Sequence, residues 1–265
     1  MNREKLYVIK IGGNVIDNPA ALKSFLADFA AINSHKILVH GGGKAATALL
    51  PKMGIEPKMT GGRRITDQPT LDVVTMVYAG LISKNVVAQL QSLNCNAVGL
   101  SGADGNFIHA RKRPVKEIDY GFAGDLDENS VNAGGISRLI DADFTPVFSA
   151  ITHDKTGQLL NTNADTIASA LAVGLSSHYE TQLVYCFEKK GVLRDVHDDD
   201  SVITQIASAE LAALTEKGII AEGMLPKLQN AFSAIEKGVQ KVLIGHAADL
   251  RLLEKDSPFG TTLSA

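Results

Sequence analysis

The sequence predicts an α/β protein in which helices cover both faces of an open, mainly parallel sheet. Apolar strand patterns alternate with helical patterns along the 265 residues, which is the order that parallel strands and their crossover helices require. The strands are largely apolar, as strands buried on both faces are. Two of them end in glycine runs, at residues 12–13 and 41–43. Because ligands of such sheets bind outside the carboxyl ends of strands, these glycines mark the expected site.

The N-terminal segment predicts two strand–helix units. The run KLYVIKI, residues 5–11, is typical of a buried strand, and Asn18 followed by Pro19 indicates a helix start. A second strand over 36–40 leads through three glycines into a helix over 44–53. The helix after Pro19 places four apolar side chains on one face, namely Leu22, Phe25, Leu26 and Phe29.

A long helix is predicted from about Pro69 to Leu93, with Asp67 as its N-cap. Its apolar residues repeat with the helical period at Leu71, Val74, Tyr78, Leu81 and Ile82. The segment NAVGLSG, residues 96–102, predicts a strand, and residues 106–112 predict half of a hairpin.

The second half of the chain continues the alternation. Asn163 is the expected N-cap of a helix. Further helices are expected over 132–141, 208–217 and 222–237, and strands over 145–151, 182–187 and 241–245.

The composition limits the possible functions. The formal net charge of −3 argues against a nucleic-acid partner, and no long uncharged apolar run predicts a membrane span. The N-terminus enters a strand directly, without the apolar segment of a signal peptide. Cys95 and Cys186 lie in apolar surroundings, which is typical of reduced, buried thiols in a cytoplasmic protein. The acidic stretch HDDDS, residues 197–201, is interpreted as a solvated turn, so no metal ligands are assigned.

Two motifs indicate other chemistries, and each match is incomplete. Gly41, Gly43 and Ala46 fit a dinucleotide-binding pattern, but the region that should end the next strand in an acidic residue reads GIEPKMTGGRRIT. HGGG, residues 40–43, resembles the oxyanion loop of serine ester hydrolases, and GLSGA could present Ser101 as a nucleophile. The nucleophile elbow of such hydrolases has the pattern G-x-S-x-G followed by a helix, and GLSGA lacks both the last glycine and the helix.

Two lysines favour phosphoryl transfer without a P-loop. The motif G-x-x-x-x-G-K-[ST] does not occur in the sequence. Lys10 lies inside an apolar strand just before Gly12 and Gly13, where a buried charge needs a partner or a function. Lys227 lies in the opening turns of a predicted helix, where the helix dipole disfavours a cation. Either a bound anion accounts for Lys227 or it is an ordinary solvated lysine.

The motifs resemble those of the amino-acid kinases, and within that family those of the N-acetylglutamate kinases. The matching segments follow the family's order over almost the whole chain: IKIGGNVI, VHGGGKA, GGRRITD, VGLSGADGN, LLNTNADTIASALA, IIAEGMLPKLQNA and PFGTTL. NTNAD together with GMLPK is fairly specific to the acylglutamate branch. KIGG alone would also fit aspartate, uridylate or carbamate kinases.

The resemblance implies the amino-acid kinase fold, a three-layer αβα sandwich, as a single domain over 1–265. An N-terminal lobe, 1–175, would hold the acylglutamate and the dimer interface, and a C-terminal lobe, 176–265, would hold ATP with Mg²⁺. The implied reaction is phosphorylation of the γ-carboxylate of an N-acyl-L-glutamate in arginine biosynthesis. Another carboxylate kinase of this fold, or a sensor that binds ligand without catalysis, remains an alternative.

The resemblance also assigns roles by position. Lys10 and Lys227 match the catalytic lysines, and Asp165 matches the aspartate that orients them. The acylglutamate is expected at Gly42, Gly43, Arg64, Asn161 and Asn163, with Arg64 on the α-carboxylate. Because Arg63 and Arg64 are adjacent, either arginine could be the one that matches the α-carboxylate ligand of the family. ATP is expected at Gly12, Gly13, Glu188, Gly191, Val192, Leu193 and Ile220.

Three departures from the family pattern bear on specificity. Glu188 takes the place of an aspartate in the nucleotide loop, Ala103 stands where lysine is more frequent, and Gly62 replaces a larger residue. They leave open whether the acyl group is acetyl or a charged one such as succinyl. The resemblance further implies a homodimer joined through the helix from Pro69. We expect no response to arginine, because the extra N-terminal helix of the arginine-inhibited hexamers has no counterpart before the first strand.

Overall fold

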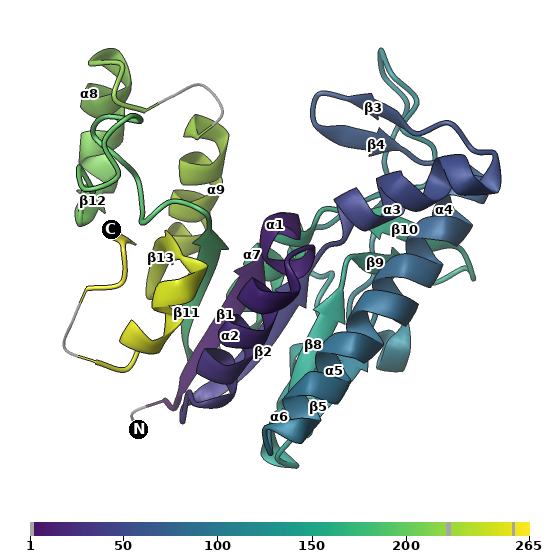
Figure 1. Cartoon of the computed structure of the whole chain (residues 1–265), viewed down its shortest axis with the longest axis horizontal. Helices are drawn as coiled ribbons and strands as arrows, with labels where there is room; N and C mark the ends of the chain where they lie inside the picture. Colours follow the sequence, from purple (N-terminus) through teal and green to yellow (C-terminus); the bar gives the residue numbers. More distant parts are fainter. Residues whose placement is uncertain (1–2, 221–223, 256–257) are drawn as a thin grey trace.

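The computed structural model describes residues 3–220, 224–255 and 258–265. Its main sheet has the strand order β12-β14-β13-β11-β1-β2-β8-β5 (Figure 1). All neighbouring strands are parallel except β13 and β14, which confirms the predicted mainly parallel sheet. The bounds are β1 (Lys5–Ile11), β2 (His35–His40), β5 (Ala97–Leu100), β8 (Thr145–Ser149), β11 (Glu180–Phe187), β12 (Gln205–Ala207), β13 (Lys241–His246) and β14 (Thr261–Ser264).

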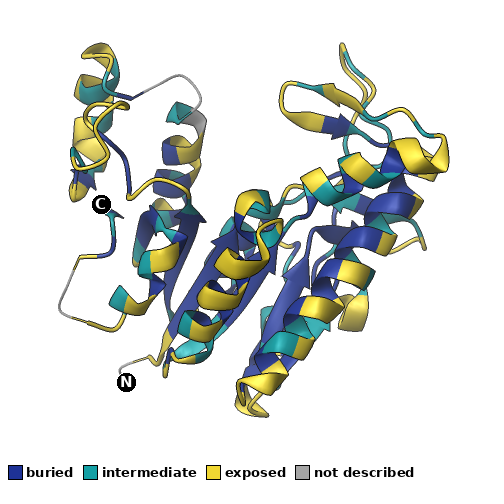
Figure 2. Ribbon diagram, viewed as in Figure 1, coloured by how far each residue is buried: buried dark blue, intermediate teal, exposed yellow. Residues whose placement is uncertain are grey.

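Helices cover both faces of this sheet, which gives the expected three layers. On one face α2 (Pro19–Ala30) packs against α5 (Ser83–Ser92) and the short helix η5 (Ala247–Leu252). On the other face α7 (Ala164–Leu175) packs against α6 (Ala133–Asp141) and α9 (Leu225–Glu236). Figure 2 shows the strands between these layers as buried.

Three predicted N-caps are confirmed, because each side chain satisfies a free N–H group at a helix start. Asn18 accepts hydrogen bonds from the N–H groups of Ala20 and Ala21 at the start of α2. Asp67 accepts from Thr70 at the start of α4 (Gln68–Thr75), and Asn163 accepts from Thr166 at the start of α7.

The long predicted helix is continuous over Gln68–Ser92, but its middle is a π-helix, η2 (Met76–Ile82). Leu81, which belongs to the apolar repeat of this helix, is 59% exposed and does not pack in the core. The wider π turn changes the angle between successive side chains, so Tyr78 and Ile82 stay buried while Leu81 turns outward.

By length and composition the helix Gln68–Ser92 is also the one candidate membrane span among the described residues. Its Leu71, Val74, Tyr78 and Ile82 belong to the protein core. A buried core helix meets the same criteria.

Two smaller sheets stand beyond the carboxyl ends of β2 and β8 (Figure 1). One is a hairpin of β3 (Lys58–Thr60) and β4 (Arg63–Ile65), and the other has the order β6-β7-β10-β9. Of these strands, the segment expected over 106–112 as half of a hairpin contains β6 alone. The bounds of the second sheet are β6 (Arg111–Lys112), β7 (Ala123–Asp125), β9 (Ile151–His153) and β10 (Leu159–Thr162).

The remaining helices are shorter than predicted. The segment expected over 44–53 is α3 (Gly43–Leu49) followed by the 3-10 helix η1 (Leu50–Met53). The segment over 208–217 is the 3-10 helix η4 (Ser208–Glu210) followed by α8 (Leu211–Glu216). The helix predicted to begin at 222 is described from Leu225 onward, and residues 221–223 lie outside the described residues.

The two cysteines are buried and free, as predicted. Burial raises the pKa of the Cys186 thiol, because a thiolate inside the core would lose its hydration. Both thiols therefore act as small apolar side chains of the core.

Candidate active site

A cavity of about 240 Å³ opens at the carboxyl ends of β1 and β2, where the glycine runs lie. Eight predicted site residues line it together, although they come from four separate stretches of the chain: Lys10, Gly12, Gly13, Gly42, Gly43, Arg64, Asn161 and Asn163. The strand ends, the β3–β4 hairpin and β10 bring these stretches together.

Lys10 is held at the wall of this cavity by an ion pair. Its side chain leaves β1 near the carboxyl end and is only 9% exposed. Its Nζ lies 2.7 Å from Oδ1 of Asp165, in the first turn of α7, and 5.8 Å from the centre of the Phe187 ring. The sequence indicated that this lysine needs a partner, and the structure provides Asp165.

Lys227 converges on the same place from the other end of the chain. It lies in the first turn of α9, and its Nζ is 4.4 Å from the centre of the Phe187 ring. The two ammonium groups therefore share one aromatic ring and are separated by no more than the sum of their distances to it. Together with Asp165 they form a site with two positive charges and one negative charge.

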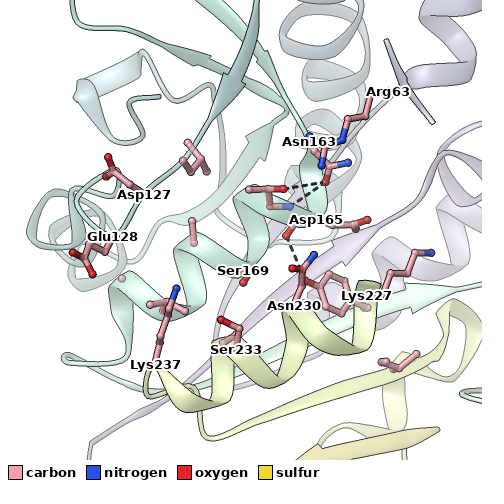
Figure 3. Close-up of a pocket in the computed structure, with 18 of the residues that line it drawn as sticks. Arg63, Asp127, Glu128, Asn163, Asp165, Ser169, Lys227, Asn230, Ser233 and Lys237 are labelled. Atoms are coloured by element: carbon pink, nitrogen blue, oxygen red, sulfur yellow. Dashed lines mark hydrogen bonds between the residues drawn. The ribbon is translucent and has the colours of Figure 1, made fainter. Parts of the chain in front are cut away.

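A second cavity of about 540 Å³ continues from this site along the groove between α7 and α9 (Figure 3). It shares Gly62, Arg63 and Asn163 with the first cavity. Asp165 and Lys227 line it near α7's start, while Asp127, Glu128 and Lys237 lie at its far end. The two cavities thus meet at the β3–β4 turn and the N-cap of α7, with Lys10 lining the smaller cavity and Lys227 the larger one.

Gly42 is required by close packing. A Cβ atom at this position would lie 2.8 Å from Cδ1 of Tyr78 and closer still to Ile82. The absence of a side chain lets the loop between β2 and α3 pass directly beneath η2, and this contact fixes the wall of the cavity.

His40 ends β2 just before that loop and is fully buried. Its Nδ1 lies 2.8 Å from the carbonyl oxygen of Gly41, to which it donates in the neutral tautomer. Burial lowers the pKa of His40 to about 4, because the charged imidazolium would lose its hydration. At neutral pH the histidine therefore holds the glycine loop as an uncharged group.

Arg64 and its neighbour Arg63 differ in burial and in hydrogen bonding. Arg64 is 8% exposed, and its Nη2 donates to the Gly43 carbonyl oxygen and to Oγ1 of Thr47. Its Nη1 is buried and has no hydrogen-bond partner within the described part of the chain. Arg63 is exposed and lines both cavities. A buried guanidinium with an unused donor is suited to a carboxylate ligand.

The two asparagines are positioned by local hydrogen bonds. Nδ2 of Asn161, in β10, donates to Oγ1 of Thr66, and Oδ1 of Asn163 caps α7 by accepting from Thr166. Both line the smaller cavity. Asn163 therefore both caps α7 and lines the cavity.

The predicted nucleotide loop lies outside both cavities. Glu188 is exposed, and Gly191, Val192, Leu193 and Ile220 are buried. The N–H of Val192 donates to Oγ1 of Thr261, so this loop is tied to β14. The role of these residues stays a prediction.

The acidic stretch after this loop forms ion pairs with neighbouring lysines. Asp199 pairs with Lys189, and Asp200 pairs with Lys190. No group of three or more histidine, cysteine or acidic residues suited to a metal ion occurs within residues 3–220, 224–255 and 258–265.

The geometry does not support the hydrolase alternative. The hydroxyl group of Ser101 donates to Oδ2 of Asp104, 2.8 Å away, and a short 3-10 turn follows it in place of a helix. The late histidine that a triad would need, His246, ends β13. Strands β11, β1, β2 and β8 separate β13 from β5, which precedes Ser101. A serine nucleophile and its base must be within hydrogen-bond reach, and these two are not.

Three residues of the site were missed from the sequence. Phe187 was assigned to a buried strand and Tyr78 to the apolar repeat of a helix, and Arg113 directly follows the segment 106–112 that was expected to be half of a hairpin. Tyr78 and Arg113 line the smaller cavity, and Phe187 lines the larger one. The aromatic position directly before Glu188, at the carboxyl end of a buried strand, was the one available signal for Phe187.

Comparison with known proteins establishes the class of this protein. The model of the amino acid kinase family matches residues 5–246. The chain belongs to the amino acid kinase family.

Within that family, the chain is similar to curated acetylglutamate kinases. The acetylglutamate kinase of Cytophaga hutchinsonii is 53% identical over 264 residues, with 99% of each chain covered. That of Phocaeicola vulgatus is 55% identical over 242 residues, which cover 91% of this chain and 93% of the relative. The chain is accordingly an enzyme, a phosphotransferase of the acetylglutamate kinase type.

Solved structures share the fold. N-acetylglutamate synthase from Neisseria gonorrhoeae, complexed with coenzyme A and N-acetyl-glutamate, matches with a TM-score of 0.82 at 23% identity. All of this chain is covered, and it spans 60% of the synthase chain. Carbamate kinase from Giardia lamblia bound to AMP-PNP matches with a TM-score of 0.72 at 15% identity, covering 99% of this chain and 98% of that one.

Proposed function

We propose that this protein transfers the γ-phosphoryl group of ATP to the γ-carboxylate of an N-acyl-L-glutamate, acetyl or succinyl, in arginine biosynthesis. The products are ADP and the γ-acyl phosphate. The observation that carries the proposal is the convergence of Lys10 and Lys227 on the ring of Phe187, with Asp165 paired to Lys10. The names of the curated relatives support the same reaction.

The chemistry requires positive charge more than a base. A γ-carboxylate has a pKa of about 4.3, so it is already ionised at neutral pH and needs no deprotonation. The barrier arises because two anions, the carboxylate and the γ-phosphate, must approach each other. Lys10 and Lys227 offset this repulsion, and the ion pair with Asp165 fixes the ammonium group of Lys10 in place.

The smaller cavity suits the acceptor. The buried guanidinium of Arg64 would take the α-carboxylate through its unused Nη1, and Asn161 would hydrogen-bond the amide. Arg113 lines the same cavity and is paired with Asp125. This second guanidinium is the feature that keeps a charged acyl group such as succinyl in the proposal.

The donor end would use the lysines, the glycine loop and the loop after β11. The N–H groups of Gly12 and Gly13 border the cavity beside Lys10, and backbone donors and ammonium groups are the partners that phosphates bind. The nucleoside would lie against the loop over 188–193 and Ile220. Mg²⁺ keeps most of its ligands as water and phosphate oxygens, so few protein groups are needed.

The assignment of two lobes and of a homodimer belongs to the same proposal. Residues 1–175 would hold the acylglutamate, and 176–265 would hold ATP. Met76 and Leu81 project from η2 as exposed apolar side chains, 50% and 59% exposed, and would form the dimer interface. The two free buried thiols support a cytoplasmic location.

An assay of ADP release from MgATP tests the reaction, with N-acetyl-L-glutamate and N-succinyl-L-glutamate side by side. We expect ADP and a hydroxylamine-reactive acyl phosphate with at least one of them. Ser101→Ala should retain activity, and Lys10→Ala should lose it. No ADP release with either acylglutamate would contradict the proposal.

A further inference from the structure

The π-helical segment η2 presents a tyrosine to the smaller cavity. Tyr78 lines this cavity together with Lys10, Gly43 and Arg64, and it is 5% exposed. A π-turn interrupts the regular hydrogen bonds of a helix, and such interruptions are frequent at functional sites. Here the π-helical segment lies between α4 and α5, and its Tyr78 and Ile82 pack against Gly42 of the glycine loop.

The contacts of Tyr78 place its hydroxyl group over that loop. The edge of the ring fills the space beside Gly42, where a Cβ atom would lie 2.8 Å from Cδ1. A Cβ atom on Gly43 would lie 3.9 Å from the hydroxyl oxygen. The ring is therefore fixed by packing, and the hydroxyl group is directed along the loop toward Gly43.

Burial keeps the hydroxyl group of Tyr78 protonated. Burial raises the pKa of Tyr78, and the neighbouring guanidinium of Arg64 opposes part of this rise. The phenol is thus a hydrogen-bond donor throughout the neutral range. Arg64 can only donate, so it cannot accept the phenol proton. The Gly43 carbonyl oxygen already accepts from Arg64 and lies within the first turn of α3, where it also accepts from Thr47.

We propose that Tyr78 is a substrate-binding residue whose hydroxyl group donates to the carboxylate that Arg64 binds. One oxygen of the carboxylate would accept from the free Nη1 of Arg64 and the other from the phenol. Both residues line the smaller cavity, and the two oxygens of a carboxylate would provide one acceptor for each donor. This inference rests on the proposed function and assigns a residue to its acceptor site.

Tyr78→Phe tests the inference, because it removes the hydroxyl group and leaves the ring against Gly42. The dissociation constant of the acylglutamate, measured by calorimetry, and its KM should rise about tenfold, since a hydrogen bond to a charged group is lost. The KM for ATP should stay unchanged. The melting temperature without substrate should also stay unchanged, because the hydroxyl group serves the ligand and not the fold.

Tyr7→Phe is the matched control. The Tyr7 hydroxyl donates to the Leu253 carbonyl oxygen, 3.0 Å away, on a strand whose start lies far from the cavity. This variant should lower the melting temperature and leave the dissociation constant unchanged.

Two results separate the possible failures. If the unchanged protein turns over an acylglutamate and Tyr78→Phe binds it equally well, the inference is overturned and the proposed function stands. A purely structural role, shown by a lowered melting temperature with unchanged binding, overturns it as well. If the unchanged protein neither binds nor phosphorylates N-acetyl- or N-succinyl-L-glutamate, the proposed function fails and the inference fails with it.

Discussion

Nζ of Lys10 lies 2.7 Å from Oδ1 of Asp165, and this ion pair joins the end of the first strand to the start of α7. The lysine is nearly buried, whereas the aspartate is partly exposed and lines the larger cavity. A buried cation with one anionic partner retains donors for a further anion. The pair therefore holds the positive charge of Lys10 in place and leaves it available to a phosphoryl group.

Lys10→Ala should reduce kcat by about 10²–10³-fold, because a charge that stabilises the transferring group is lost. Lys5→Ala is the matched control, since Lys5 is exposed at the other end of β1. Steady-state kinetics with MgATP and the acylglutamate measure both variants. A Lys10→Ala enzyme with kcat within a factor of three of the unchanged protein would exclude this role.

Gly42→Ala should lower the free energy of unfolding by about 1–3 kcal/mol, because the added methyl group meets Tyr78 and Ile82 in a packed site. Gly12→Ala is the control: its added Cβ meets nothing within 4 Å, so the change should stay below about 1 kcal/mol. Urea denaturation measures both. Equal stabilities of the two variants would show that the loop moves freely beneath η2.

Asp67→Ala should cost about 1 kcal/mol of stability, because the N–H of Thr70 loses the carboxylate that caps α4. Asp67→Asn should restore most of this loss, since an amide oxygen also accepts the bond. Thermal unfolding followed by circular dichroism distinguishes the two. The capping role is refuted if both variants have the same melting temperature as the unchanged protein.

His40 should make the protein less stable in mild acid. Its pKa is about 4 in the folded protein and 6.5 in the unfolded chain, so only the unfolded chain takes up a proton between these values. The stabilising contribution is therefore complete above pH 6.5 and is lost as the pH falls toward 4. The total loss is about 3 kcal/mol.

The test for His40 compares the unchanged protein with His40→Gln, whose side chain does not titrate. Urea denaturation at pH 7, 6 and 5 should show the stability difference between them shrinking by about 2 kcal/mol. Parallel pH curves for the two proteins would assign the acid sensitivity to other groups.

Local chemistry made much of the fold predictable. Asn18, Asp67 and Asn163 cap helices by bonds to residues two or three positions ahead, and the sequence shows both partners at once. The parallel sheet was likewise predictable, because buried strands separated by helices have few other arrangements. The positions of Lys10 and Arg64 in a ligand cavity were predictable from their resemblance to a family, and the structure separates Arg64 from Arg63 by burial.

The sequence by itself determined six strands of the main sheet, three helix N-caps, the family and the lysines expected to carry the chemistry, since each depends on neighbouring residues or on a motif. Only the tertiary structure decided that Phe187 lies beneath both lysines, that Tyr78 packs on the glycine loop and that Leu81 faces outward. These relationships depend on how segments distant in the chain pack together and on one π turn that shifts the helical phase. Packing of this kind is fixed by the shapes of many side chains at once, so no short stretch of sequence contains it.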